Sequence, residues 1–400
     1  MWYNAKPNDT SPSAFEPRPK ISIVGRFLRT TAMGRQERIA RSVVRAILNS
    51  TGVEGRPRNP ISWILAVISV FFSLYQLALR KIRPADFANL RREHWKVDDD
   101  DYVNSFRPRE DDKQEQALSA IGDMGFSGST FYSTADQKYL VKSVPRYSEH
   151  SFFRDDLLTP YVEYMATHPR SLLVRICDFL GASGFSIGRI LRLAPSHHIV
   201  MENIMFGRQL AKDRGEVDWE DWDLKPTSYF YPERDIADGA LTSEATKNQL
   251  ADEFHDRMIL TREQADTFFA SLEEDTRLLA AHNAVDYSLF LVRMRTPERD
   301  AEEDPGSSQM VPTNPPSVPP DPPSWRTGVA SADGKYIFRA AILDFFWAKH
   351  KIQPRIMTLL VTLWNVLISR QGHMSITTTP DEYRERFMKM VRGIVVVRDE

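Results

Sequence analysis

Several short segments of this 400-residue sequence contain residue types that could bind a phosphate group or its counter-ion. The first is a glycine- and serine-rich turn with Gly125, Ser127, Gly128 and Ser129, between two apolar segments. Glycine lets backbone N–H groups approach phosphate oxygens closely, so a hairpin with such a turn can bind phosphate. A purely structural hairpin turn explains the same pattern.

Two lysines follow that could neutralise phosphate charge. Lys142 lies in the strand predicted after the glycine turn, among apolar neighbours. If its side chain faces inward it must be paired, because burying a lone ammonium is costly. Nucleotide phosphates are one such partner. Lys225 is the second lysine, beside a predicted turn in the sequence Asp223-Leu224-Lys225.

Two aspartates are predicted at strand ends. Asp286 stands at the mouth of a strand after the helical stretch Leu272–Asn283, where it could accept a proton, bind a metal or simply cap the helix. Asp344 ends the apolar strand around Ala341–Leu343 and needs a cation beside it. Together the two carboxylates would suit Mg²⁺.

The order of these segments is more informative than any one of them. A glycine hairpin, a strand lysine, a strand ending at Met201-Glu202-Asn203 and the segments around Lys225, Asp286 and Asp344 follow one another. Phosphoryl transfer needs a backbone cradle, a lysine on the phosphates, a carboxylate near the acceptor and a metal-binding carboxylate. The sequence therefore predicts a phosphotransferase.

The chain from about residue 116 to 395 resembles the phosphatidylinositol phosphate kinases. The segments that carry this resemblance are Leu140–Val144, Pro169–Leu173, Val200–Asn203, Asp223–Lys225, Asp275-Thr276, Val285–Leu289, Ile342–Asp344 and Tyr383–Phe387. The resemblance implies an α+β, two-lobed fold related to protein kinases and SAICAR synthase, with an antiparallel sheet in the N-lobe and an ATP cleft.

The same resemblance implies a role for each candidate residue. Lys142, the glycine turn and the hinge residues Met201 and Glu202 would bind ATP. Asp344 would ligate Mg²⁺, Asp286 would be the catalytic carboxylate, and Lys225 would act beside it. The substrate would be a phosphoinositide headgroup, contacted by three basic residues in the segment after Asp344, namely Lys349, Lys351 and Arg355.

Some residues depart from the family pattern and leave alternatives open. Pro226 follows Lys225 where the family has glycine, Glu202 replaces a hinge asparagine, and Glu149 is the one candidate for an acidic partner of Lys142. The alternatives are a pseudokinase that binds nucleotide or acts as a scaffold at a membrane, and a membrane-anchored adaptor in which the kinase fold is a spacer. A kinase of soluble metabolites is a weaker alternative.

The patterning also divides the chain. Residues 1–60 are predicted to be a basic, largely disordered arm with one short helix near Arg38–Leu48, residues 61–83 an apolar helix, and 84–115 a charged connector. A kinase-like domain covers 116–395, interrupted by an acidic, Pro- and Ser-rich insertion over 296–330 that is expected to be disordered. The uncharged stretch Ile61–Leu79 is long enough to span a membrane, to lie at its interface or to be buried.

Charge and cysteine usage set the expected partners. The arm holds eleven Lys and Arg against four Asp and Glu, giving +7 in a chain of net charge −2, and so favours an anionic membrane surface unless it is only a solvated tail. We do not expect nucleic acid as a partner, because the sequence shows no pattern of a basic groove. The single cysteine, Cys177, lies in an apolar run and is interpreted as core packing. We expect the chain at the cytoplasmic face of a membrane, or anchored through residues 61–79, in an oligomeric state that the sequence leaves open.

Overall fold

The computed structural model of the chain describes residues 23–48, 77–108, 117–123, 129–183, 194–213, 219–226, 254–296, 324–348 and 379–398. Several of the predicted features lie outside these ranges. They are Gly125, Ser127 and Gly128 of the glycine turn, most of the apolar segment 61–79, and the three basic residues Lys349, Lys351 and Arg355. None of the helices within the described ranges is both long and apolar enough to cross a membrane.

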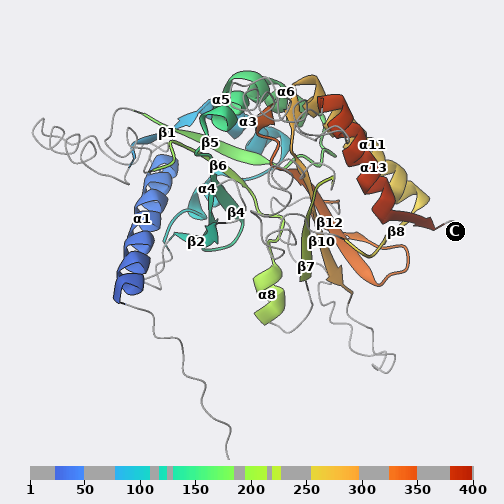
Figure 1. Cartoon of the computed structure of the whole chain (residues 1–400), viewed down its shortest axis with the longest axis horizontal. Coiled ribbons are helices and arrows are strands. Elements are labelled where there is room, and N and C mark those ends of the chain that lie inside the picture. Colours follow the sequence, from blue (N-terminus) through green and yellow to red (C-terminus); the bar gives the residue numbers. More distant parts are fainter. Residues whose placement is uncertain are drawn as a thin grey trace, which may run out of the picture.

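One half of the molecule is built on a six-stranded antiparallel sheet with the order β1-β5-β6-β4-β3-β2 (Figure 1). The strands are β1 (Leu79–Ile82), β2 (Leu118–Asp123), β3 (Thr130–Thr134), β4 (Tyr139–Ser143), β5 (Ile176–Ala182) and β6 (His197–Glu202). Strands β4, β5 and β6 carry mostly buried residues, as expected for the middle of a sheet that is covered on both faces. The predicted mixed α and β fold with an antiparallel sheet is confirmed.

The other half contains a four-stranded antiparallel sheet with the order β11-β12-β10-β7. Its strands are β7 (Trp219–Leu224), β10 (Ser288–Arg295), β11 (Val329–Ala330) and β12 (Tyr336–Leu343). Two short strand pairs complete this half, β9 (Ala284–Val285) with β13 (Trp347–Ala348), and β8 (Met258–Thr261) in parallel with β14 (Val395–Arg398).

Helices surround the two sheets. They are α1 (Ile23–Leu48), α3 (Pro84–Asn89), the π-helical turn η2 (Leu90–His94), α4 (Asp99–Asn104), α5 (Tyr147–Phe152), the π-helical turn η3 (Phe153–Leu157), α6 (Leu158–Thr167), α8 (Arg208–Asp213), α11 (Arg262–Ala281) and α13 (Pro380–Ile394). The two long helices α11 and α13 pack side by side (Figure 1). Both begin with a capping box, at Thr261 and Thr379, which satisfies N–H groups of the first turn.

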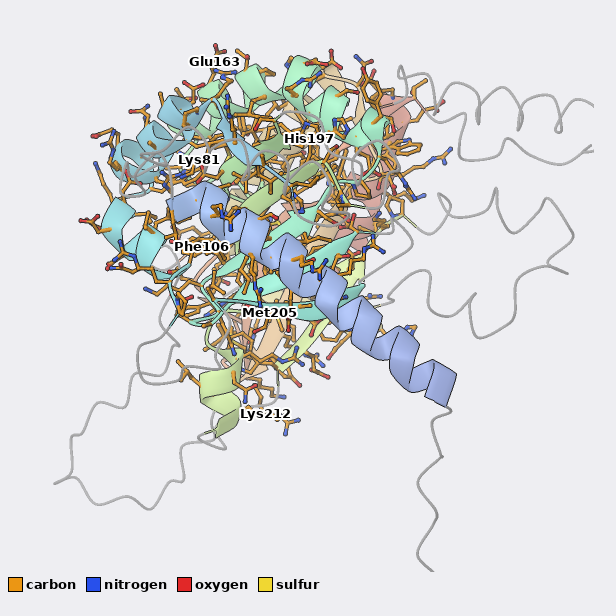
Figure 2. All side chains as sticks on the ribbon, turned by 90° about the vertical axis from the view of Figure 1, so that its left-hand side faces the viewer. Lys81, Phe106, Glu163, His197, Met205 and Lys212 are labelled. Carbon is orange, nitrogen blue, oxygen red and sulfur yellow. The ribbon has the colours of Figure 1, made fainter. Side chains whose placement is uncertain are left out.

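Helix α1 replaces much of the arm that was predicted to be disordered. Ile39, Val43 and Ile47 recur every four residues, and all three are buried. Contacts with β1 and β2 place the helix against the six-stranded sheet, and Figure 2 shows it lying across that part of the molecule. The Ser42 hydroxyl accepts a hydrogen bond of 3.1 Å from the Leu77 N–H, which ties the helix to the chain just before β1. The prediction of a short helix near Arg38–Leu48 captured only its C-terminal half.

The prediction of a connector over 84–115 is wrong for residues 84–108, which belong to the folded domain. Four aromatic side chains there are fully buried, Phe87, Trp95, Tyr102 and Phe106. The charged residues around them hid this burial in the sequence, and several of those charged residues form ion pairs. The Asp178 carboxylate on β5 accepts a hydrogen bond from Tyr102 (2.7 Å) and lies 2.9 Å from Lys81 Nζ and 3.4 Å from Arg91 Nη1.

Two other predicted boundaries also change. Residues Leu79–Ile82 form the edge strand β1, so the apolar helix expected over 61–83 cannot extend to Ile82. The insertion expected over 296–330 ends before Ser324, because Trp325 and Arg326 are buried and Val329–Ala330 form β11. The interpretation of Cys177 is confirmed, since the thiol lies in the main core and burial raises its pKa.

Candidate functional site

Four charged side chains from distant parts of the sequence meet between the two sheets. Lys142 on β4 forms an ion pair with Asp344, which follows β12. Lys225, just after β7, lies with its Nζ 2.9 Å from Asp286 Oδ1. The Lys225 ammonium also interacts electrostatically with Asp344, which joins the two pairs into one cluster. The structure thus brings together the two lysines and two aspartates that the sequence singled out.

The two aspartates are placed by turns that lie opposite each other. Asp286 stands between β9 and β10, and Asp344 between β12 and β13. Since β9 pairs with β13 and β10 with β12, the strand pairing on either side holds the turns together. Both aspartates have left-handed backbone conformations, with φ of 65° and 61°. A non-glycine residue in this region is strained, and such strain often marks functional sites.

The environment of the cluster favours the charged forms of Asp344 and Lys225. Partial burial acts to raise the pKa of Asp344, but the nearby ammonium groups of Lys142 and Lys225 outweigh it and hold that pKa below its usual range. Burial acts to lower the pKa of Lys225, and Asp286, Asp223 and Asp344 reverse this effect and raise it. An aspartate that remains a carboxylate and a lysine that remains an ammonium can bind a cation and a phosphate, respectively.

Lys142 is enclosed more tightly than the other members of the cluster. Its side chain is only 6% exposed, and its Nζ lies 5.3 Å from the centroid of the Phe131 ring and 5.7 Å from that of Phe346. These rings leave the ammonium directed at Asp344. Glu149, which the sequence offered as a partner, instead pairs with Arg146 at 3.2 Å, although it still interacts with Lys142 electrostatically.

The glycine turn joins β2 to β3, which pair as the predicted hairpin with Asp123 opposite Thr130. Lys142 is one strand further along than predicted, in β4 and not in the second strand of the hairpin. Ser129 is the turn residue that the structure describes, and it is fully buried. Since β3 pairs with β4, Lys142 lies opposite Phe131, close to the end of the turn.

The two predicted hinge residues lie on opposite faces of the sheet. In the register of β4 with β6, Lys142 lies opposite Ile199 and Leu140 lies opposite Met201. Side chains alternate between the two faces along a strand, so Met201 is on the same face of the sheet as Lys142. Glu202 falls on the other face, where its carboxylate is buried and pairs with Arg326. The side chain of Glu202 is therefore not directed at the Lys142–Asp344 pair. The chain then continues through residues 203–206 to α8. At the start of this segment, the Asn203 side-chain amide donates a hydrogen bond of 2.7 Å to the Gln137 carbonyl.

Helix α13 supports the turn that carries Asp286. The Tyr383 hydroxyl donates a hydrogen bond of 2.5 Å to the backbone carbonyl of Tyr287. The Tyr287 ring packs edge-on against those of Tyr383 and Phe387, at centroid distances of 4.7 and 5.0 Å. Helix α13 therefore fixes Tyr287, the residue that directly follows Asp286.

The charges of the cluster could hold a cation and a phosphate group together. Within the described ranges, no three His, Cys, Asp or Glu side chains are placed to hold a metal by themselves. A divalent cation can also be bound by one or two carboxylates together with phosphate oxygens of a ligand. Asp344 would supply the carboxylate, and Lys142 the charge for the phosphates.

Sequence reasoning missed Arg326. It lies in the segment predicted to be disordered, yet it forms the buried ion pair with Glu202. The adjacent Trp325 was the available signal, because a tryptophan next to an arginine is unusual in a segment otherwise rich in Pro, Ser and acid. Lys349, Lys351 and Arg355, expected to contact the substrate, lie outside the described residues and stay predictions.

Comparison with known proteins gives two matches. A family model described as phosphatidylinositol-4-phosphate 5-kinase matches residues 112–394, well over half of the chain. A probable phosphatidylinositol phosphate kinase from Dictyostelium discoideum is 27% identical over 188 residues, which are 47% of this chain and 24% of that protein. This chain therefore matches about a quarter of the length of that relative.

Proposed function

Because the chain belongs to the phosphatidylinositol-4-phosphate 5-kinase family, we propose that it transfers the terminal phosphate of ATP to a phosphatidylinositol phosphate headgroup. The observation that carries this proposal is the meeting of Lys142 with Asp344 and of Lys225 with Asp286 between the two sheets. Two cations and two carboxylates at one place are what phosphoryl transfer needs, since its catalysis is mostly positioning and charge stabilisation.

The fold we propose is the two-lobed arrangement of protein kinases and SAICAR synthase. The six-stranded sheet would form the N-lobe, and the four-stranded sheet with α11 and α13 the C-lobe. Residues 203–206, which follow β6 and lead to α8, would be the hinge. In support, Lys142 comes from the first sheet and Asp344 from the second, so a ligand held by both would lie between the lobes.

Each residue of the cluster then has a role. Lys142 would bind the ATP phosphates, together with backbone N–H groups of the turn that contains Gly125, Ser127, Gly128 and Ser129. Asp344 would hold Mg²⁺, which when bound neutralises charge on the phosphates. Asp286 would orient the acceptor hydroxyl and accept its proton, and Lys225 would hold the Asp286 carboxylate in place and stabilise the transferring phosphate.

The substrate headgroup belongs to a membrane, and one face of α1 supports contact with an anionic surface. Arg35, Arg38, Arg41 and Arg45 recur at helical spacing and are all exposed, opposite the face that packs on the sheet. Each such arginine near an anionic leaflet contributes about 1 kcal/mol. Lys349, Lys351 and Arg355 would add to this grip near the acceptor site. The apolar residues 61–79 would add an anchor to this contact with the membrane.

The test is phosphate transfer to lipid vesicles. The chain is incubated with radiolabelled ATP, Mg²⁺ and vesicles that contain single phosphatidylinositol phosphates. We expect labelled lipid from at least one of them, and Asp286→Asn to reduce the label at least a hundredfold because the proton acceptor is lost. Equal labelling by wild type and Asp286→Asn would refute the proposal.

A nucleotide-binding pseudokinase is the second candidate, and Pro226 favours it. Proline fixes φ and removes an N–H donor directly after Lys225, so this turn differs from one with glycine. The same assay separates the two functions. Binding of ATP–Mg²⁺ without lipid labelling, together with labelling by Pro226→Gly, would assign the wild-type chain to the second.

A further inference from the structure

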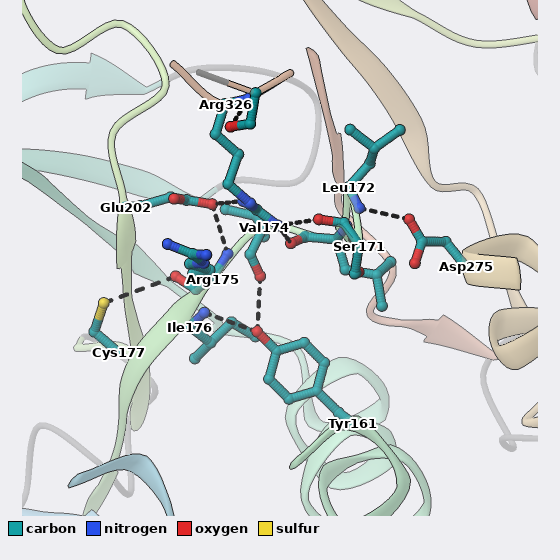
Figure 3. A network of polar contacts seen from close by, with 12 residues as sticks. Tyr161, Ser171, Leu172, Val174, Arg175, Ile176, Cys177, Glu202, Asp275 and Arg326 are labelled. Carbon is teal, nitrogen blue, oxygen red and sulfur yellow. Dashed lines mark hydrogen bonds and ion pairs between the residues drawn. The ribbon is translucent and has the colours of Figure 1, made fainter. Parts of the chain in front are cut away.

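A buried ion pair connects the hinge strand to a segment far away in the sequence. The guanidinium of Arg326 pairs with the carboxylate of Glu202, the last residue of β6, and their side chains are only 5% and 0% exposed. The second terminal nitrogen of Arg326 donates hydrogen bonds of 2.5 Å to the carbonyls of Ser171 and Leu173 (Figure 3). Glu202 also accepts a hydrogen bond of 2.9 Å from the Arg175 N–H. Arg326 therefore bridges β6 and the turn before β5.

The residues beside Arg326 hold the other half of the molecule. We call residues 324–328 the hinge strap. The Trp325 ring packs against Phe268 of α11, with 4.3 Å between the ring centroids. The backbone carbonyl of Trp325 accepts a hydrogen bond of 2.8 Å from the Ala340 N–H on β12. The hinge strap is thus fastened to α11 and β12 on one side, and through Arg326 to the six-stranded sheet on the other.

A second arginine joins the hinge strap to the hinge itself. Buried Arg339 on β12 donates through Nε to the Thr327 carbonyl at 3.0 Å. Its Nη1 donates to the carbonyls of Ile204 and Phe206, both at 2.9 Å. Residues 203–206 are therefore held from two directions, by Arg326 through Glu202 and by Arg339 directly.

We propose that Arg326 is a positioning residue for the nucleotide. It fixes Glu202, and through Glu202 it fixes the angle at which residues 203–206 join the two sheets. This inference rests on the proposed function, in which ATP is held by Lys142 of one sheet and Asp344 of the other. The distance between those two groups depends on how the sheets are joined, and small misplacements of binding groups reduce their effect strongly.

The two ion pairs of the site depend differently on the position of residues 203–206. Lys142 and Asp344 come from opposite sides of the hinge, so nucleotide binding depends on it. Lys225 and Asp286 both come from the half that contains the four-stranded sheet, and their contact does not cross the hinge. Loss of Arg326 should therefore weaken nucleotide binding and leave the affinity for lipid largely unchanged.

The experiment compares Arg326→Met, Arg326→Lys and Glu202→Gln in the full chain. The dissociation constant of ATP–Mg²⁺ is measured by titration calorimetry, and the KM values for ATP and lipid by phosphate transfer. We expect Arg326→Met to raise both nucleotide constants about tenfold or more and to change the lipid KM less than about twofold. Arg326→Lys, which keeps the charge but not the fork of donors, should lie between this variant and wild type.

A double variant shows whether the two residues act as one unit. Glu202→Gln keeps the acceptor for the Arg175 N–H but removes the charge that faces Arg326. If Arg326 acts through Glu202, adding Glu202→Gln to Arg326→Met should change nucleotide affinity little beyond the single variant. Fully additive losses would contradict action through Glu202.

Arg293→Met is the matched control. Arg293 pairs with two carboxylates, Glu220 and Asp256, and its guanidinium packs over the rings of Trp222, Phe254 and Tyr336, so it takes no part in the Arg326–Glu202 pair. This variant should bind ATP–Mg²⁺ as wild type does. The proposal is overturned if Arg326→Met binds nucleotide normally, or if its KM values for ATP and for lipid rise together. It is also overturned if Arg326→Met, Arg326→Lys and Glu202→Gln all fail to unfold cooperatively. Absence of nucleotide binding in the wild type would instead refute the proposed function.

Discussion

Each ammonium in the candidate site faces a carboxylate. Lys142 pairs with Asp344 and Lys225 with Asp286, so neither lysine is buried as a lone charge. This explains how a side chain as enclosed as that of Lys142 stays compatible with the fold. It also means that a nucleotide with its metal would exchange ionic partners at the site, the lysine turning to phosphate and Asp344 to the cation.

Lys142→Ala should abolish stabilisation by nucleotide. A ligand that binds only the native state at one hundred times its dissociation constant raises the free energy of unfolding by about 2.7 kcal/mol. We therefore expect ATP–Mg²⁺ to raise the melting temperature of the wild type by several degrees and that of the variant hardly at all. Lys335→Ala, at an exposed lysine before β12, is the control. A full shift in Lys142→Ala would contradict the role given to this residue.

Asp275 predicts a pH dependence of stability. It is fully buried on α11, where burial raises its pKa to about 6 although Tyr164 and the Leu172 N–H donate hydrogen bonds to it. A raised pKa in the folded state stabilises the fold at low pH, and this contribution is lost as the pH rises through about 6. From the ordinary value of 3.8 the loss is on the order of 3 kcal/mol.

Urea unfolding at pH 5 and at pH 7.5 measures the part of this loss that lies above pH 5, about 1.4 kcal/mol. The free energy of unfolding of the wild type should fall more between these pH values than that of Asp275→Asn, which cannot titrate. Comparing the two slopes removes the contributions of other groups, and any loss of hydrogen bonding in the variant affects both pH values. Parallel slopes would show that Asp275 keeps an ordinary pKa.

Among the helices and strands, α13 has a role beyond packing. The helix contacts α11 and β9, and Tyr383 reaches the backbone immediately after Asp286. The strand pair β9–β13 joins the same turn to the chain that follows Asp344. The turn of Asp286 is therefore held both by a short strand pair and by a helix more than ninety residues later in the chain.

Tyr383→Phe tests this support. The substitution removes one hydroxyl and keeps the ring contacts with Tyr287, so the free energy of unfolding should fall by about 1 kcal/mol. We expect kcat for lipid phosphorylation to fall roughly threefold to tenfold, because Asp286 is held less firmly, with the KM for ATP unchanged. Tyr147→Phe, at a tyrosine that is 71% exposed, should alter neither quantity. An unchanged kcat in Tyr383→Phe would limit the helix to a packing role.

The chain as a whole extends its folded domain beyond the boundaries expected from the sequence. Lys142, Asp286 and Asp344 could be predicted because each lies within or at the end of an apolar segment, and Lys225 because it lies beside a turn, in an order that phosphoryl transfer requires. The same local logic failed where burial depends on distant partners. Arg91, in the segment that carries the buried aromatic residues of 84–108, pairs with Asp178 on β5, and Arg326 pairs with Glu202 at the end of β6. Such pairings are set by the tertiary fold.

Truncation tests how far the domain extends. A chain that begins at residue 110, close to the start of the family match, lacks α1, β1 and the segment with Trp95 and Tyr102. It also leaves Asp178 buried without Lys81 and Arg91, and removing the partner of a buried charge costs about 3–5 kcal/mol. We expect no cooperative thermal unfolding from this chain and a normal transition from one that begins at residue 23. Cooperative unfolding of the shorter chain would show that the family match alone folds.

The position of Cys177 has a practical consequence for labelling the protein. It is the single cysteine of the chain, it is 1% exposed, and burial raises the pKa of its thiol, so it should react slowly with maleimides. A cysteine introduced at an exposed site, such as Leu210→Cys on α8, would then be the one that takes up a fluorophore. The natural sequence can therefore serve as a background for labelling the chain at one chosen position.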